Sequence, residues 1–204
     1  MKLYIFFWDL FQSLIGGNFE KRKSIKSFLK PQHLKVLEIG CATGFLCTIF
    51  QKTNIQYYGF DIDKVAIEFA KKKFVKFKNI TFVNSDLKIL LNQIKFDLIL
   101  IPSVLHHCDD SEVKKIFKTL ITNTKNRLKV DIYIAEPRKV TEYCNHFNRI
   151  FIRFFERGKF LRSKKNLIKL VSNYIVLKKN HYFKTLKFFS YYASYHDVLF
   201  GKLK

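Results

Sequence analysis

Residues 36–44, Val-Leu-Glu-Ile-Gly-Cys-Ala-Thr-Gly, decide how this 204-residue chain folds. The apolar residues at the start of the stretch predict a buried strand over 35–39, Gly40 and Gly44 bound a tight turn, and a helix is expected over 44–52. A strand, a glycine turn and a helix form the nucleotide-binding unit of doubly wound sheets, because glycine lets the backbone approach a ligand where a Cβ would clash.

Further strand patterns follow this unit, and their ends carry polar residues. The expected strands span 56–60, 80–83, 96–101 and 130–135. The second strand ends in Asp61, which lies 21 residues after Gly40. A doubly wound sheet places a carboxylate there to accept hydrogen bonds from ribose hydroxyls. The third strand ends in Asn84-Ser85-Asp86.

This succession over residues 31–140 resembles the class I S-adenosylmethionine (SAM)-dependent methyltransferase family. The usual first motif of that family is acidic-x-Gly-x-Gly-x-Gly; Glu38, Gly40 and Gly44 match it, and Ala42 replaces the middle glycine. The resemblance implies methyl transfer with SAM as cofactor and S-adenosylhomocysteine (SAH) as product. It also implies a doubly wound, mostly parallel seven-stranded sheet with helices on both faces and an antiparallel edge hairpin at the C-terminus. Alanine adds only a methyl group, so we expect SAM binding to survive.

The resemblance also implies which residues contact the cofactor. Glu38 and the Gly40–Gly44 loop would hold the methionine portion, Asp61 the ribose, and Asp86 with its neighbours the adenine. The expected set is Glu38, Gly40, Cys41, Ala42, Thr43, Gly44, Asp61, Ile62, Ser85, Asp86, Leu87, Pro102 and Ser103. A dinucleotide oxidoreductase is the competing interpretation, and the acid at position 38 and the Ser85-Asp86 pair argue against it.

Two histidines at the end of the fourth strand are candidate catalytic residues. His106 and His107 fall at the carboxyl edge, where doubly wound sheets bind ligands, and histidine has the pKa range of a general base. Alternatively, one packs under the cofactor and the other hydrogen-bonds backbone. The Val-Leu-His-His run resembles the segment common in family members that methylate small molecules and lipids. The stretch lacks the Asn/Asp-Pro-Pro-aromatic motif with which many amino-group methyltransferases hold a planar nitrogen, although other RNA methylation stays open.

The formal net charge of +22 is concentrated late in the chain, since residues 111–204 carry 22 basic and 6 acidic side chains. Lysine outnumbers arginine 31 to 7, which suggests AT-rich coding. Such coding does not explain five arginines within 25 residues, which are the candidate acceptor contacts Arg138, Arg149, Arg153, Arg157 and Arg162. Arg149, Arg153 and Arg157 recur every four residues, so on a helix they would share one face, and a helix is expected over 141–156. That face is either solvated or a site for a phosphate, a carboxylate, nucleic acid or an anionic membrane surface.

The chain is long enough for one domain, with an N-terminal helical cap at 1–30 and a methyltransferase domain at 31–204. The apolar stretch 3–15 is shorter than the ~20 residues of a spanning helix and lacks a basic start, so it packs over the pocket or lies in a membrane interface. The remaining expected elements are helices at 64–74, 87–93, 111–123 and 164–172, and hairpin strands at 174–188 and 190–201.

The four cysteines show no metal-binding spacing, so we expect no metal and reduced thiols in a cytoplasmic protein, with peripheral membrane attachment left open. Cys41 is interpreted as a small filler of the loop. Glu136 and Arg138, at the end of the fifth strand, either face the acceptor or pair with the basic surroundings. The leading hypothesis is methyl transfer to oxygen or carbon of a small-molecule or lipid-linked, anionic acceptor. The alternatives are an RNA methyltransferase and a non-catalytic partner subunit with the same fold, and no oligomeric state is predicted.

Overall fold

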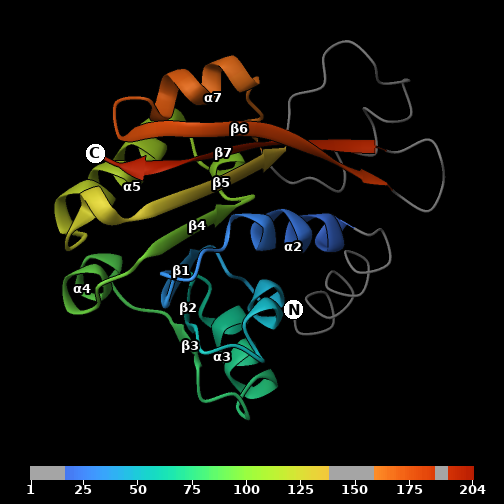
Figure 1. The fold of residues 1–204 in the computed structure, drawn as a ribbon, viewed down its shortest axis with the longest axis vertical. Coiled ribbons are helices and arrows are strands. Elements are labelled where there is room, and N and C mark those ends of the chain that lie inside the picture. Colours follow the sequence, from blue (N-terminus) through green and yellow to red (C-terminus); the bar gives the residue numbers. More distant parts are fainter. Residues whose placement is uncertain (1–16, 138–158, 187–192) are drawn as a thin grey trace.

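The computed structural model describes residues 17–137, 159–186 and 193–204, which form a sheet with helices packed on both of its faces (Figure 1). Three predictions fall on residues outside the described ranges. They are the apolar stretch 3–15, the helix expected over 141–156, and the candidate acceptor contacts Arg138, Arg149, Arg153 and Arg157. Within the described residues, no helix is long and apolar enough to cross a membrane.

The sheet has seven strands in the order β3-β2-β1-β4-β5-β7-β6. Its parallel part consists of β1 (Lys35–Ile39), β2 (Gln56–Phe60), β3 (Ile80–Val83), β4 (Leu98–Pro102) and β5 (Asp131–Pro137). β7 (Ala193–Leu203) runs antiparallel between β5 and the edge strand β6 (Ile175–Leu186). The predicted fold class, with its antiparallel C-terminal pair, is therefore confirmed.

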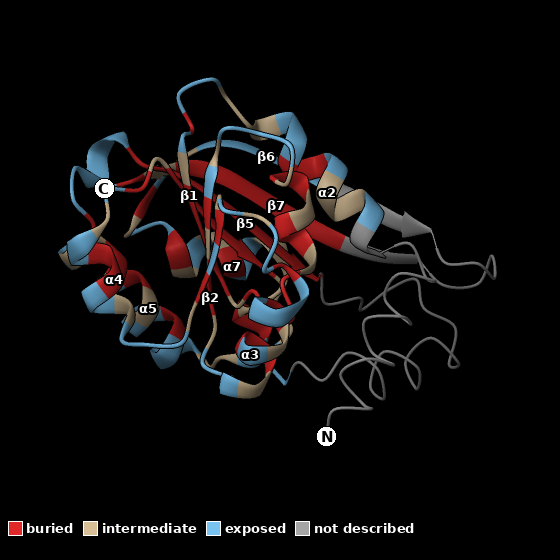
Figure 2. Cartoon of the chain, turned by 90° about the horizontal axis from the view of Figure 1, so that it is seen from below, coloured by how far each residue is buried: buried red, intermediate tan, exposed pale blue. Residues whose placement is uncertain are grey.

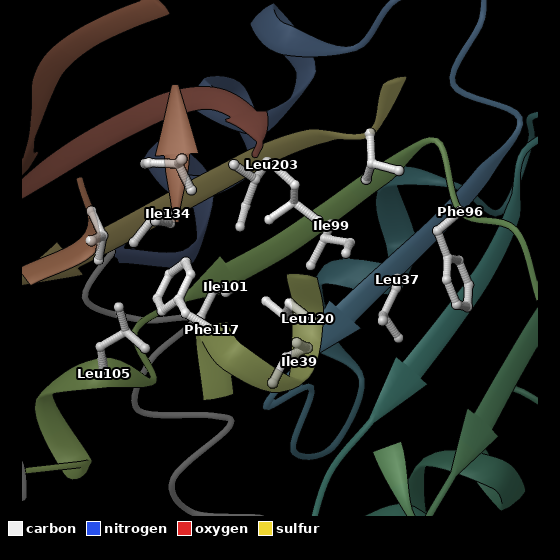
Figure 3. Close-up of a cluster of buried hydrophobic side chains, with 14 of the residues drawn as sticks. Leu37, Ile39, Phe96, Ile99, Ile101, Leu105, Phe117, Leu120, Ile134 and Leu203 are labelled. Carbon is white, nitrogen blue, oxygen red and sulfur yellow. The ribbon is translucent and has the colours of Figure 1, made fainter. Parts of the chain in front are cut away.

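Alternation along the central strands explains the two layers of helices. One set of buried strand residues, including Val36 and Leu100, packs with α2 (Gly17–Phe28), η1 (Phe45–Ile49) and α3 (Lys64–Lys73). The other set packs with α4 (Leu87–Gln93), α5 (Asp110–Asn123) and α7 (Lys164–Val171). Figure 2 shows the buried side of each helix turned toward the sheet. In Figure 3, Leu37, Ile99 and Ile101 of the strands gather with Phe117 and Leu120 of α5.

Side-chain caps fix where the main helices begin. The Asp63 carboxylate accepts from two backbone N–H groups at the start of α3, and Ser163 caps α7. Helix α5 is capped by Asp109, which forms a reciprocal capping box with Glu112. Two short 3-10 turns complete the helical elements, η2 (Leu105–His107) and η3 (Arg127–Lys129).

The helix predicted over 44–52 is the clearest local correction. The segment forms the 3-10 helix η1, which spans Phe45–Ile49 and has no side-chain cap. Its preceding residue, Gly44, has a left-handed backbone, and the Thr48 hydroxyl donates to the Phe45 carbonyl 2.9 Å away. A tight turn entered from a left-handed residue, with a threonine bonding back along the chain, favours a short 3-10 piece over a regular helix.

Helix α2 is the described part of the predicted N-terminal cap, and polar contacts tie it to both halves of the sheet. The Tyr133 hydroxyl of β5 donates to Ser24 Oγ at 2.9 Å, and His181 Nε2 of β6 lies 3.3 Å from the same oxygen. At the other side, Arg22 donates to Thr48 at 3.2 Å, and its guanidinium stacks on the Phe45 ring. Because Ser24 contacts β5 and β6 while Arg22 contacts η1, α2 is fixed across one face of the sheet. The division into a cap at 1–30 and a domain at 31–204 stays a prediction.

Candidate functional site

The turn after β1 has a backbone that excludes side chains. Gly40 and Gly44 have φ values of 75° and 78°. A Cβ on Gly40 would lie 2.4 Å from Val104 Cγ2, and one on Gly44 would lie 2.5 Å from Phe82 Cζ. Both glycines are therefore required by space as well as by conformation. The N–H of Gly40 donates to the Phe60 carbonyl at 2.8 Å, which joins the turn to the end of β2.

Ala42, which stands where the family motif has a glycine, is exposed and has a φ of 45°. A left-handed backbone costs an L-residue about 1–2 kcal/mol, whereas glycine adopts it freely at a somewhat larger entropic cost. The Ala42 N–H donates to Asp61 Oδ2 at 2.8 Å, so this strained position is held by the carboxylate that ends β2. The turn and the end of β2 therefore form one unit.

We expect Ala42→Gly to raise the melting temperature, because it relieves this strain. The net gain should be about 0.5–1 kcal/mol after the extra chain entropy of glycine, which corresponds to a shift of about 2 °C for a domain of this size. Ala66→Gly, inside α3, is the matched control and should lower the melting temperature. Calorimetric scanning of both variants tests the assignment. A lower melting temperature for Ala42→Gly would show that the strain is absent.

Glu38 lies in β1 just before the turn and is buried. It accepts a hydrogen bond from the Tyr57 hydroxyl of β2. Burial raises the pKa of Glu38 to about 7, while the Tyr57 hydrogen bond and the nearby Lys21 ammonium oppose the rise. A cationic group placed beside this carboxylate would stabilise its charged form, so the end of β1 suits an ammonium.

The expected ribose and adenine contacts line one edge of the sheet beyond β2 and β3. Asp61 is half-buried, and its second oxygen accepts from the Asp63 N–H at 2.9 Å. The next side chain, Ile62, is 88% exposed, which provides an apolar surface against which a flat ring can pack. Asp86 is exposed and caps α4 by accepting from the Lys88 N–H at 2.8 Å. Among the other expected contacts, Ser85 is exposed, Leu87 is half-buried, and Cys41, Thr43 and Pro102 are buried.

The end of β4 faces this turn and carries a second strained residue. Ser103 has a φ of 59°, and its N–H donates to the Ala135 carbonyl of β5 at 2.6 Å. Its hydroxyl accepts a hydrogen bond from Lys21 Nζ of α2 at 2.9 Å. A non-glycine residue with a left-handed backbone is uncommon and concentrates at functional sites. The bond also brings a lysine to the carboxyl edge of the sheet.

Glu136 at the end of β5 organises the segment that follows β4. One carboxylate oxygen accepts from the N–H groups of Val104 and Leu105, at 2.9 and 2.8 Å. The other accepts from the His106 N–H at 3.1 Å and lies 2.8 Å from His106 Nδ1. Glu136 is buried, and a carboxylate that accepts several hydrogen bonds fixes the backbone that supplies them.

The two candidate catalytic histidines lie side by side, with ring centroids 4.1 Å apart. His106 is buried, and since a carboxylate only accepts, its Nδ1 carries the proton that is donated to Glu136. In the tautomer with its proton on Nδ1, the lone pair of His106 is on Nε2. Partial burial, together with the neighbouring His106, lowers the pKa of His107, whose side chain is exposed. His107 is therefore able to accept a proton at neutral pH.

Arg162, the one described member of the candidate acceptor arginines, is engaged by the protein itself. Its Nε and Nη2 donate to the Asp110 carboxylate at 2.9 and 2.7 Å. The remaining donors reach the carbonyls of Leu105, Phe160 and Cys108. All five N–H groups of a guanidinium are used by this set. Arg162 therefore anchors the backbone on either side of the two histidines, at Leu105 and Cys108. An acceptor that bound Arg162 would have to displace one of these hydrogen bonds.

The sequence analysis missed Lys21, which the structure brings to the site. It named Glu136 but missed that this carboxylate holds the loop after β4. Glu136 had a visible signal, because it is a charged residue that ends a strongly apolar strand. Lys21 had none, since it is one of several lysines on α2. Burial raises the pKa of the Cys41 thiol, which fits a filler of the loop. Among the described residues, no group of three or more histidine, cysteine or acidic side chains could hold a metal ion.

Comparison with known proteins places this arrangement in a family. Residues 30–182 match the family model of a methyltransferase domain. Ribosomal RNA small subunit methyltransferase A of Mesomycoplasma hyopneumoniae is 26% identical over 156 residues, which cover 68% of this chain and 60% of that protein. The protein of the same name from Mycoplasma mobile is 30% identical over 132 residues, which cover 62% of this chain and 51% of that protein. The chain thus spans between half and two thirds of these curated relatives.

Several solved structures share the fold at low sequence identity. Magnesium protoporphyrin IX methyltransferase from Synechocystis PCC 6803 with bound SAH has a TM-score of 0.64 at 18% identity, covering 93% of this chain and 84% of that chain. The PH0226 protein from Pyrococcus horikoshii has a TM-score of 0.66 at 14% identity, with coverages of 92% and 90%. The family match covers most of the chain, and the strand order and glycine turn agree with it. The chain therefore belongs to the methyltransferase-domain family, and its fold is that of the class I SAM-dependent methyltransferases.

Proposed function

We propose that this methyltransferase transfers the methyl group of SAM to an oxygen or carbon atom of a small-molecule or lipid-linked, anionic acceptor. The observation that carries the proposal is the segment after β4, where Glu136 fixes a pair of histidines at the carboxyl edge of the sheet. An acceptor hydroxyl or carbon acid benefits from such a base. The same segment lacks the Asn/Asp-Pro-Pro-aromatic motif with which many amino-group methyltransferases hold a planar nitrogen.

The residues present fit SAM at the carboxyl edge of the sheet. Glu38 would face the ammonium of the methionine portion, the Gly40–Gly44 turn would lie along it, and Asp61 would accept from the ribose hydroxyls. Ile62 would pack on the adenine ring, with Asp86 beside it. When bound, SAM supplies an electrophilic methyl group on a positively charged sulfur. The contribution of the protein is alignment, which accounts for much of the rate in a displacement of this kind.

The histidines would handle the proton of the acceptor. SAM would supply the methyl group, and its sulfur would keep the electron pair of the broken methyl–sulfur bond, so the chain has only the acceptor proton to remove. The acceptor proton passes to a ring nitrogen that holds a lone pair, either His106 Nε2 or a nitrogen of His107. Glu136 orients His106 through Nδ1 and stabilises the charge that the ring gains. Bulk water then takes the proton.

The cofactor placement predicts that Asp61→Ala weakens SAH binding at least tenfold, because a charged hydrogen bond contributes roughly 1.5–3 kcal/mol. Part of this loss can come through the turn, since Asp61 also accepts from the Ala42 N–H. Calorimetric titration with SAH measures the affinity, and circular dichroism checks the fold. Glu68→Gln, on the exposed side of α3, is the control and should bind normally. Unchanged affinity in folded Asp61→Ala would remove the ribose assignment.

RNA is the second candidate acceptor, favoured by the names of the two curated relatives and by the charge of +16 on residues 111–204. Methyl-labelled SAM separates the two candidates when the enzyme is given either a lipid and metabolite extract or small ribosomal subunits. The proposal expects label in the extract and none in RNA, with Asp61→Ala, whose weaker cofactor binding should lower the labelling, as the control. Label in RNA alone, with activity that falls steeply as salt is raised, would establish the second candidate instead.

A further inference from the structure

We propose that Lys21 of helix α2 binds the carboxylate of the methionine portion of SAM, with the Ser103 hydroxyl beside it. The inference rests on the proposed placement of SAM at the end of β1. It assigns to the cofactor site a residue of a helix that precedes the glycine turn, since Lys21 lies 19 residues before Gly40. The anion it would recognise is a single carboxylate, next to an ammonium on the same carbon atom.

The position of the Lys21 ammonium supports this assignment. Nζ donates to Ser103 Oγ at 2.9 Å, so the charge lies at the carboxyl end of β4. It also lies near enough to Glu38 to favour the ionised form of that carboxylate. The ends of β1 and β4 are neighbours in the sheet, with Val36 paired to Leu98 and Glu38 to Leu100. Lys21 therefore reaches the edge at which the methionine portion would lie.

The carboxylate of the methionine portion would need a cation beside it at the end of β1. The methionine portion carries an ammonium and a carboxylate on one carbon, and Glu38 suits the first of these. The same Glu38 charge would repel the ligand carboxylate, and at a few ångströms this repulsion is worth several kcal/mol in a partly buried site. A lysine near both groups offsets it. Lys21 and Glu38 together form a pair of opposite charges that matches the pair on the ligand.

Helix α2 presents Lys21 from a fixed backbone. The next residue, Arg22, is tied to Thr48 and stacked on Phe45 of η1. One turn along the helix, Ser24 and Ile25 are buried, and Ser24 Oγ accepts from Tyr133 of β5. Because the helix is held in the turn that follows Lys21, placing its ammonium costs only the rotamers of one side chain.

The test compares SAH with its decarboxylated analogue, S-adenosyl-3-thiopropylamine, by calorimetric titration. The wild type should bind SAH at least tenfold more tightly than the analogue. Lys21→Gln keeps helix propensity and removes the charge, so it should weaken SAH about 10- to 100-fold while the affinity for the analogue stays within about twofold. Lys21→Arg should retain most of the preference. Lys23→Gln, an exposed change on the same helix, should leave both affinities unchanged.

The outcomes separate this inference from the proposed function. If folded Lys21→Gln keeps the wild-type preference for SAH, or loses affinity for both ligands equally, the carboxylate assignment is wrong even though the cofactor site stands. If the wild type binds neither ligand, the proposed placement of SAM fails and the inference fails with it. Loss of the preference in Lys21→Gln alone supports the inference.

Discussion

At least one of the variants His106→Asn and His107→Asn should transfer methyl groups about 10²–10⁴-fold more slowly than the wild type, which is the usual contribution of a general base. The affinity for SAH should change little, because the base acts on the acceptor. Asparagine retains hydrogen bonding and removes the titratable ring. His106→Asn should also lower stability, since His106 is buried and bonded to Glu136.

The pH profile distinguishes a base from a packing residue. A histidine must be neutral to accept a proton, so turnover should fall as the pH drops through its pKa. The pKa of His107 lies below its ordinary value because of burial and the nearby His106, which places the fall below about pH 6.5 for this residue. The assay follows label from SAM into the acceptor identified by the extract experiment. Normal turnover and an unchanged profile in both variants would mean that alignment alone drives the reaction.

Glu136→Ala should have the largest effect on stability, because four hydrogen bonds converge on its carboxylate. Removing the acceptor leaves buried donors unpaired, and each costs about 1–3 kcal/mol. Backbone relaxation recovers part of this, so we expect a loss of about 3–5 kcal/mol, a large share of the 5–15 kcal/mol typical of a domain. Denaturant unfolding measures it. Glu112→Gln, which alters the exposed capping box of α5, is the matched control and should cost about 1 kcal/mol or less.

Glu136→Gln tests the positioning role in protein that remains folded. Glutamine keeps one accepting oxygen and loses the charge. The negative charge of Glu136 raises the pKa of His107, so its loss should move the acidic fall in turnover to lower pH if His107 is the base. A purely structural role predicts lower stability with an unmoved pH profile. If the free energy of unfolding of Glu136→Ala lies within about 1 kcal/mol of the wild-type value, the four hydrogen bonds to Glu136 do not stabilise the protein as proposed.

Local sequence patterns were sufficient to predict the first three strands of the parallel sheet. The strands 35–39, 56–60 and 80–83 were predicted at their observed bounds, because apolar runs bounded by turn residues are a strong signal in a buried parallel sheet. The strands expected over 96–101 and 130–135 shifted by one or two residues at their ends, where pairing partners decide the limits. The change from α-helix to η1 depended on the left-handed turn at Gly44, which composition does not reveal.

The site was predictable where a motif occupies consecutive residues and less so where distant elements meet. The Gly40–Gly44 turn and the position of Asp61 followed from spacing alone. The link between Lys21 and Ser103 joins residues 82 apart, and the links from Glu136 to the histidine segment span about 30 residues. Nothing in the local sequence specifies such pairs. Arg162 illustrates the converse, because a clustered arginine that suggests an anion site can be consumed by backbone carbonyls of its own fold.

The insertion of β7 between β5 and β6 has a consequence for the order in which the protein assembles during translation. β6 precedes β7 in the chain, yet its neighbour in the sheet is β7 and not β5. A ribosome that has made residues only as far as β6 therefore exposes a finished strand with no partner. Such non-local pairing is slow and leaves strand edges open to aggregation. Two lysines on β6, Lys178 and Lys179, provide a charge barrier that would keep that waiting strand from pairing with other nascent chains.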